Sequence, residues 1–177
     1  MRKTIIAAAL LAGGTGVLAL TVPVVAASAS TTPVTVEVGG GSLGISAPDG
    51  AVDLGSVPAS TVPQTVQHLL GTVTVTDDRA GTAGWVATAE AADFTGPQTI
   101  STSTAGQVTY NPGDVNVTGT AVVAATFENQ LYPAGPVETA TGVSGNNTAA
   151  WNPTITVTIP ANALAGTYST TVTHSVS

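Results

Sequence analysis

Hydrophobic and polar residues alternate most clearly in residues 72–90 of this chain. Two alternating stretches there are joined by a turn-like segment at residues 77–81, and valines alternate with threonines in the first stretch. In the second stretch Trp85, Ala87 and Ala89 fall on one face. Because successive side chains of a strand point to opposite faces of a sheet, this period predicts two half-buried strands joined by a turn.

Shorter stretches with the same period recur along the rest of the chain. The predicted strands cover residues 34–38, 43–47, 66–76, 85–90, 107–110, 115–117, 121–127, 154–159 and 168–176. Residues 128–152 are punctuated by Gly and Pro and are predicted to form a long loop. We find no convincing helical periodicity after residue 29. The pattern therefore predicts an all-β protein, an antiparallel β-sandwich in an Ig-like or Greek-key style.

The first 29 residues have the pattern of a secretory signal peptide. A basic pair near the start is followed by a mainly apolar run over residues 4–25, and a small-x-small cleavage sequence ends at Ala29. These features predict that residues 1–29 are removed on export and that residues 30–177 form one domain of a secreted, extracellular protein. The alternative is an uncleaved membrane anchor, because the apolar run approaches spanning length.

The composition limits which partners the chain can bind and which chemistry it can perform. Only 7% of the residues are charged, and the chain contains no Cys, so neither a disulfide nor thiolate chemistry is available. The predicted domain holds ten Asp and Glu residues against Arg79 as its one basic residue, a formal charge of −9 (1 − 10). Such a domain is a poor partner for nucleic acid, anionic lipid membranes or anionic wall polymers.

Two segments resemble the signatures of a known family of surface proteins. Residues 73–87, VTVTDDRAGTAGWVA, resemble the first signature of the WxL-type cell-surface domains of Gram-positive bacteria, in which a strand ending in Thr-Asp-x-Arg precedes a Gly-rich turn and Trp-x-Leu. Residues 159–176 resemble the second signature, which has a Pro, an Ala-Gly-Thr-Tyr turn and a final strand with another Trp-x-Leu. The motif residues are Asp77, Asp78, Arg79, Gly84, Trp85, Tyr168 and His174.

The chain departs from this pattern at three positions. Ala87 takes the place of the first Leu, while His174 and Val176 take the places of the second Trp and Leu. The resemblance implies a non-catalytic protein that attaches non-covalently to the cell wall. Its implied partners are peptidoglycan, or another neutral glycan, and other surface proteins.

The two tryptophans are candidate ligand-binding residues, because an indole ring can stack on the face of a neutral sugar. For Trp85 the alternative is a core position, which the face it shares with Ala87 and Ala89 favours. Trp151 lies in the predicted loop and is the stronger candidate for an exposed platform.

Other polar residues allow two interpretations. The turn at Asp77, Asp78 and Arg79 either faces a ligand or is structural, and the structural role is favoured because one Arg among ten carboxylates will seldom lack a partner. His174 has the parity of an inward-facing residue. Oxygens for Ca²⁺ could come from Asp93, Asp114, Asn111 and Asn116, but EF-hand spacing is absent, so we predict neither a metal nor another cofactor.

Catalytic motifs are not found in the sequence. It has no Gly-x-Ser-x-Gly elbow, no His-Glu-x-x-His, no P-loop and no dinucleotide glycine pattern. Glu90 and Asp93 are a carboxylate pair of the type that hydrolyses glycosides, but few aromatic residues are available to line a groove. We therefore expect a non-catalytic wall-binding module of WxL type. The alternatives are a pilus-like structural subunit that assembles by strand pairing and, more remotely, a secreted glycan hydrolase.

Overall fold

The computed structural model describes residues 28–126 and 130–177. The chain divides into two units, Met1–Val36 and Glu37–Ser177. In the first unit the described residues, 28–36, are exposed and form no secondary structure. Apart from Ser28 and Ala29, the predicted signal peptide lies outside the described residues. No helix in the described ranges has the length and apolar character needed to cross a membrane.

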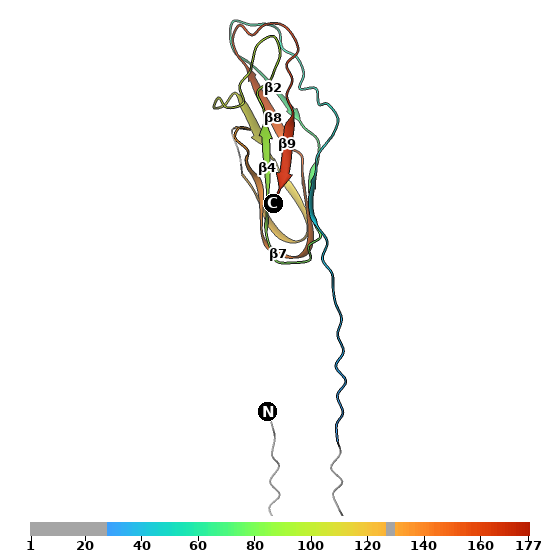
Figure 1. Cartoon of the computed structure of the whole chain (residues 1–177). Helices are drawn as coiled ribbons and strands as arrows, with labels where there is room; N and C mark the ends of the chain where they lie inside the picture. Colours follow the sequence, from blue (N-terminus) through green and yellow to red (C-terminus); the bar gives the residue numbers. More distant parts are fainter. Residues whose placement is uncertain (1–27, 127–129) are drawn as a thin grey trace, which may run out of the picture. The chain divides into compact units, whose positions relative to one another are not determined.

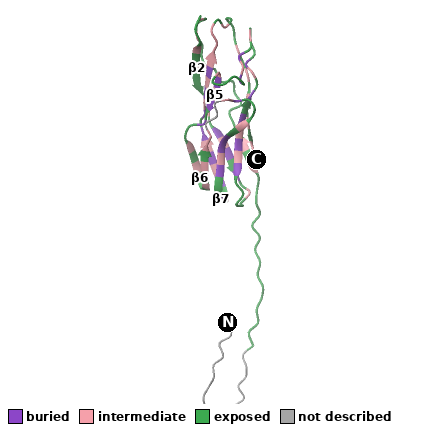
Figure 2. Cartoon of the chain, turned by 90° about the vertical axis from the view of Figure 1, so that its left-hand side faces the viewer, coloured by how far each residue is buried: buried purple, intermediate pink, exposed green. Residues whose placement is uncertain are grey.

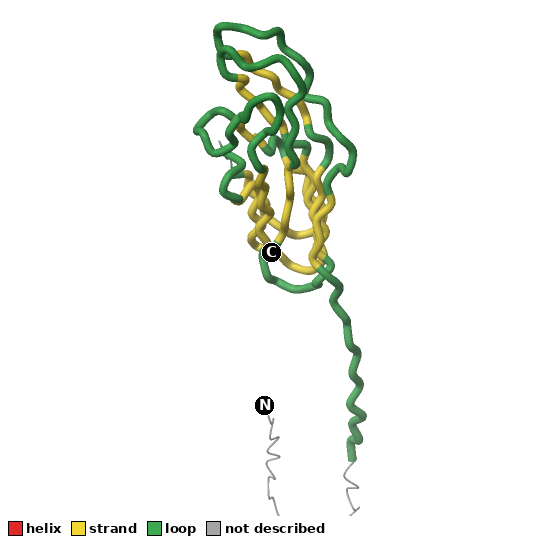
Figure 3. Tube along the Cα trace, turned by 45° about the horizontal axis from the view of Figure 1, so that its top comes forward, coloured by secondary structure: helices red, strands yellow, loops and turns green. Residues whose placement is uncertain are grey.

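The second unit is built from antiparallel strands. The strands are β1 (Leu43–Ser46), β2 (Gln64–Leu69), β3 (Val73–Asp77), β4 (Trp85–Ala91), β5 (Val108–Asn111), β6 (Val115–Ala125), β7 (Gly135–Trp151), β8 (Thr154–Ile159) and β9 (Val172–Val176). No residue within 28–126 and 130–177 is helical, and only strands and loops appear in Figure 3. The prediction of an all-β antiparallel sandwich is confirmed.

The strands form two sheets that enclose the core. The larger has the order β1-β3-β7-β4-β9, with β6 also paired to β7, and the smaller has the order β2-β8-β5. Figure 1 labels β4, β7 and β9 of the larger sheet and β2 and β8 of the smaller one. Strands β1 and β9, which pair outside β3 and β4, lie near each other. The smaller sheet covers part of the inner face of the larger one.

Strand β7 is the element that holds the larger sheet together. Strand β6 pairs along one edge of β7, while the other edge pairs with β4 through residues 135–140 and with β3 through residues 147–151. Between these two halves Gly142 and Gly145 adopt positive φ, which lets the strand bend. The turn between β3 and β4 crosses this bend, where Gly81 O accepts a hydrogen bond from Gly145 N (2.9 Å). Thus β3 and β4 each pair with β7, not with one another.

The long loop predicted over residues 128–152 is wrong, because most of this stretch is β7. Its Ala, Gly and Asn residues have little intrinsic preference for a strand. Backbone pairing on both edges overrides that local preference. Its inward-facing residues still alternate with outward-facing ones near its end, where Asn147, Ala149 and Trp151 are buried.

Other strand boundaries also differ from the prediction. The single strand expected at residues 66–76 is interrupted at Gly71 (φ 96°), so that β2 and β3 belong to different sheets. The strand expected at residues 34–38 does not form, and its residues are exposed. The strand expected at residues 168–176 is shorter, beginning at Val172.

The core lies between the sheets, where buried positions alternate with less buried ones along the strands (Figure 2). Trp85 and Trp151 are the largest fully buried side chains, each 2% exposed. Ala87 and Ala89 share the inner face of β4 with Trp85, as the alternation predicted. Small residues beside a large ring allow close packing without strain.

Candidate functional site

The turn between β3 and β4 is held by an ion pair. Arg79 Nε and Nη2 donate to the two carboxylate oxygens of Asp77 at 2.8 Å and 3.0 Å, and Nη2 also donates to the carbonyls of Ala83 and Gly84. The hydrogen bonds from Arg79 lower the pKa of the buried Asp77 carboxyl to about 2. The geometry thus supports a structural role for Arg79, because its donors bind groups of the turn itself.

The same network reaches Trp85. Asn147 Oδ1 accepts a hydrogen bond from Trp85 Nε1 (3.1 Å), and Asn147 Nδ2 donates to Asp77 Oδ2 (3.3 Å). These contacts join β3, β4 and β7 at the bend. The indole of Trp85 belongs to the core and offers no face to a sugar.

Trp151 is also a core residue, so the expectation of an exposed platform is wrong. Its Nε1 donates to Tyr110 Oη (3.1 Å), which lies 3.0 Å from His174 Nε2. Because the hydroxyl accepts from Trp151, it can donate its proton to Nε2, and a neutral His174 then carries its proton on Nδ1. Burial lowers the pKa of His174, which favours this neutral form.

Two buried polar groups near this cluster have no hydrogen-bond partner among the described residues. One is the carboxyl group of Glu138, in which neither oxygen has a partner, and the other is Nδ1 of His174. Glu138 is 0% exposed on β7, and burial raises its pKa to about 7. Burial also raises the pKa of Tyr110, and the negative charge of Glu138 adds to that increase. The centre of the domain therefore contains a carboxyl group that ionises near neutral pH.

A cleft of about 1080 Å³ lies next to His174. Its floor is formed by apolar side chains of β2 and β8, with Phe94 and Ile100, and the segment 47–60 runs across it. This segment has no regular secondary structure. At one end Pro48 packs against Gly71, and at the other Ser60 O accepts a hydrogen bond from Asn162 N (2.7 Å).

The lining of the cleft is almost uncharged. Its ionisable residues are Asp49, Asp53, Tyr168 and His174, and it contains neither Lys nor Arg. Serines, threonines and backbone amides provide hydrogen-bonding groups around the apolar floor. A cavity of this size and lining suits an uncharged ligand with some apolar surface.

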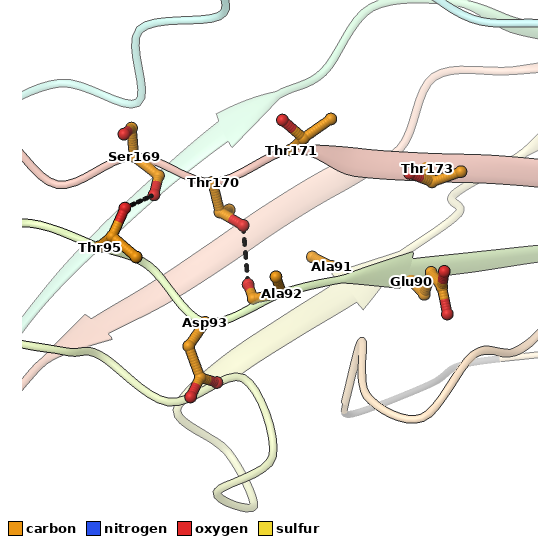
Figure 4. A pocket seen from close by; sticks show the side chains of 9 residues that line it. All are labelled: Glu90, Ala91, Ala92, Asp93, Thr95, Ser169, Thr170, Thr171 and Thr173. Carbon is orange, nitrogen blue, oxygen red and sulfur yellow. Dashed lines mark hydrogen bonds between the residues drawn. The ribbon is translucent and has the colours of Figure 1, made fainter.

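A smaller pocket of about 350 Å³ lies between the end of β4 and the chain leading into β9 (Figure 4). Glu90 and Asp93 both line it, but their side chains do not point toward one another. Asp93 Oδ1 accepts hydrogen bonds from the backbone N and the hydroxyl of Thr102, which lower its pKa. The pair therefore lacks the facing arrangement that glycoside hydrolysis uses.

Two of the four residues considered for Ca²⁺ accept hydrogen bonds from other residues of the chain. Asp93 is bonded to Thr102, and Asn111 Oδ1 accepts a hydrogen bond from Gly113 N (3.0 Å) in the turn before β6. Asn116 and Asp114 are exposed. Within the described ranges no three His, Cys, Asp or Glu residues cluster in a metal-binding arrangement.

The remaining motif residues shape the turns. Asp78 is exposed, and its backbone pairs with Gly41 and Ser42. Gly84 lies against Ala140, whose carbonyl leaves no room for a side chain at that position. Tyr168 Oη donates to Leu164 O (2.7 Å) at the rim of the cleft.

Sequence reasoning missed the cleft, Glu138, Asn147 and Tyr110. The cleft depends on the packing of distant segments, so no local pattern could reveal it. Glu138 is the one charged residue in residues 130–152, which is a sign of an unusual environment. Because this stretch is predicted to be a loop, the sequence does not indicate that Glu138 is buried.

No family model, curated protein or solved structure matches this chain.

Proposed function

We propose that this protein is a secreted, non-catalytic module of WxL type that associates with the bacterial cell wall and binds the neutral glycan of peptidoglycan in the cleft beneath residues 47–60. The lining of the cleft carries this proposal. Its floor is apolar, its rim offers hydroxyl and amide groups, and its ionisable residues include no cation to attract an anionic polymer. Sugar rings and N-acetyl groups present the matching combination of apolar faces and neutral polar groups.

The charge of the domain supports the same choice. Arg79 is the one basic residue after residue 29, and its guanidinium is bonded to Asp77 and to turn carbonyls. Anionic wall polymers therefore find no free guanidinium or ammonium group in the described structure. The resemblance of residues 73–87 and 159–176 to the WxL signatures supports a wall location.

His174 supplies a polar group in the cleft. It lines the cavity, and its Nδ1 is buried without a protein partner. We expect ligand binding to expose Nδ1–H, which then donates to a ligand carbonyl, such as that of an N-acetyl group. This position takes the place of the second Trp in the resembling family, so a polar contact here would replace an aromatic one.

The test is co-sedimentation of the secreted protein with purified peptidoglycan at increasing salt concentration. We expect saturable binding that changes little with salt, because neutral contacts are weakly screened. Leu54→Glu places a charge in the cleft lining, and we expect it to weaken binding about tenfold or more, since an ionised group in an apolar site loses hydration.

Leu69→Glu is the matched control. Leu69 lies on β2, is 52% exposed and does not line the cleft, so this variant should bind like the unmodified protein. Thermal unfolding checks that both variants are folded. The proposal fails if the unmodified protein does not sediment with peptidoglycan, or if folded Leu54→Glu binds as well as the Leu69→Glu control.

A further inference from the structure

The longest unpaired sheet edge in the described structure belongs to β6. This strand has 11 residues and pairs with β7 alone, so its other edge exposes unpaired backbone N–H and C=O groups. Edge strands are normally protected by charges, prolines or neighbouring segments. The sequence of β6, VNVTGTAVVAA, contains no charge and no proline.

The first part of β6 is regular and suited to pairing. Residues 115–119 pair in register with β7, and the register shifts only after Gly119. Val115 and Val117 face the core but are only half-buried. A further strand outside β6 would cover these two valines and complete their burial.

A segment with the complementary pattern lies just before β1. Residues 34–38 read Val-Thr-Val-Glu-Val, and Val34, Val36 and Val38 are 91%, 91% and 84% exposed. The segment makes no backbone hydrogen bond within the described structure. Three valines on one face of an extended stretch are a strong strand pattern, and their exposure leaves apolar surface uncovered.

Covalent geometry prevents the segment from pairing with β6 of its own molecule. Gly41 N donates to Asp78 O (2.6 Å), which holds the chain beside β1. The order β1-β3-β7-β6 places a strand added outside β6 four strand spacings from β1, which is about 19 Å measured along the sheet. Val38 precedes Gly41 by three residues, a reach of at most about 11 Å.

We propose that residues 34–38 of one molecule add as a strand to residues 115–119 of β6 in a second copy of this chain. Val34, Val36 and Val38 then extend the inward face of Val115 and Val117, while Thr35 and Glu37 face outward with Asn116 and Thr118. Backbone hydrogen bonds provide the attachment, as in other cases of strand addition.

This arrangement leads to open-ended assembly. The donor segment and the acceptor edge are different surfaces, so each added copy leaves one of each free. The resulting chain of subunits would present many clefts at once, which strengthens attachment to a repetitive polymer. The inference does not depend on what the cleft binds.

The first test measures self-association of the secreted protein by sedimentation velocity over a concentration series. We expect concentration-dependent oligomers, and Val36→Pro should weaken association about tenfold or more, because proline removes a donor and disrupts strand pairing. Thr31→Pro makes the same change in the exposed segment outside the donor strand and should associate normally. Val36 is exposed, so its replacement should not alter the melting temperature.

A second test locates the contact, using the fact that the chain contains no Cys. Protein with Thr35→Cys is mixed under mild oxidation with protein carrying Thr118→Cys, Asn116→Cys or the control Gln67→Cys on the exposed edge strand β2. We expect a disulfide-linked heterodimer with Thr118→Cys or Asn116→Cys, depending on strand direction, and little with Gln67→Cys. A strictly monomeric protein, normal association of Val36→Pro, or preferential cross-linking to Gln67→Cys would each overturn the proposal.

Discussion

Single residues in this protein have roles that follow from their partners. Asp77 and Glu138 are both buried carboxyl groups, but Arg79 stabilises the charge of the first, while the second has no partner in the described structure. The pKa of Asp77 is accordingly lowered to about 2, and that of Glu138 is raised to about 7. The charge on Asp77 thus stabilises the fold, and a charge on Glu138 destabilises it.

The contribution of Glu138 to the stability of the folded protein should therefore fall as pH rises from about 4.5 to about 7. In this window Glu138 is ionised in the unfolded chain but still protonated in the folded one, so the folded state binds more protons and loses stability with rising pH. The shift corresponds to about 2–4 kcal/mol. Tyr110, whose pKa is raised, remains neutral in this range. Burial lowers the pKa of His174, so His174 is more easily protonated in the unfolded chain, and its own contribution to stability changes with pH in the opposite direction to that of Glu138.

Glu138→Gln removes the ionisable group while keeping its shape. At pH 8 this variant should unfold at a higher temperature than the unmodified protein, and near pH 4.5 the two should be similar. Glu90→Gln, at an exposed position on β4, serves as the control and should leave the pH profile unchanged. Equal melting temperatures of Glu138→Gln and the unmodified protein at pH 8 would contradict this account.

At the scale of elements, β7 connects the halves of the larger sheet, and close backbone approach beside it requires glycine. A Cβ atom on Gly84 would clash with Ala140 O on β7. Gly84 also stands at a glycine position of the motif that this segment resembles. The structure explains the need for glycine there, because β4 begins directly after it and approaches β7 closely.

Gly84→Ala should destabilise the fold by about 1–3 kcal/mol, the usual cost of forcing extra volume into a packed site. The matched change is Gly44→Ala on β1, where an added Cβ meets nothing within 4 Å. That control should change stability by less than about 0.5 kcal/mol. Urea unfolding of both variants measures the difference, and equal effects would argue against the close approach of β4 to β7.

At the scale of the whole molecule, stability is unevenly distributed. The core surrounds β7, which is paired on both edges, whereas residues 49–59 form no backbone hydrogen bond to another segment of the described chain. The cleft therefore has a rigid floor of β2 and β8 and a loosely attached cover.

Hydrogen exchange should make this difference visible. Amides of β7 should exchange only through global opening, while amides of residues 49–59 should exchange many times faster, because local opening suffices. Mass spectrometry of peptic fragments measures both in one sample. Protection of residues 49–59 equal to that of β7 would show that the cover is as firmly fixed as the core. Added peptidoglycan fragments should slow exchange in residues 49–59 if the proposed ligand binds there.

The sequence alone determined the fold class and much of the β3–β4 region. Alternation of valine with threonine, and of Trp85 with small alanines, predicted which faces are buried, because the two-residue period of a strand is a local property. The pairing of Arg79 with a carboxylate also followed from composition, since one cation among ten anions has many available partners. Only the tertiary structure decided that residues 135–151 are a central strand, that Trp151 is buried, and that a cleft lies beneath residues 47–60. These features depend on pairing and packing between segments far apart in the chain, where tertiary contacts outweigh local preference.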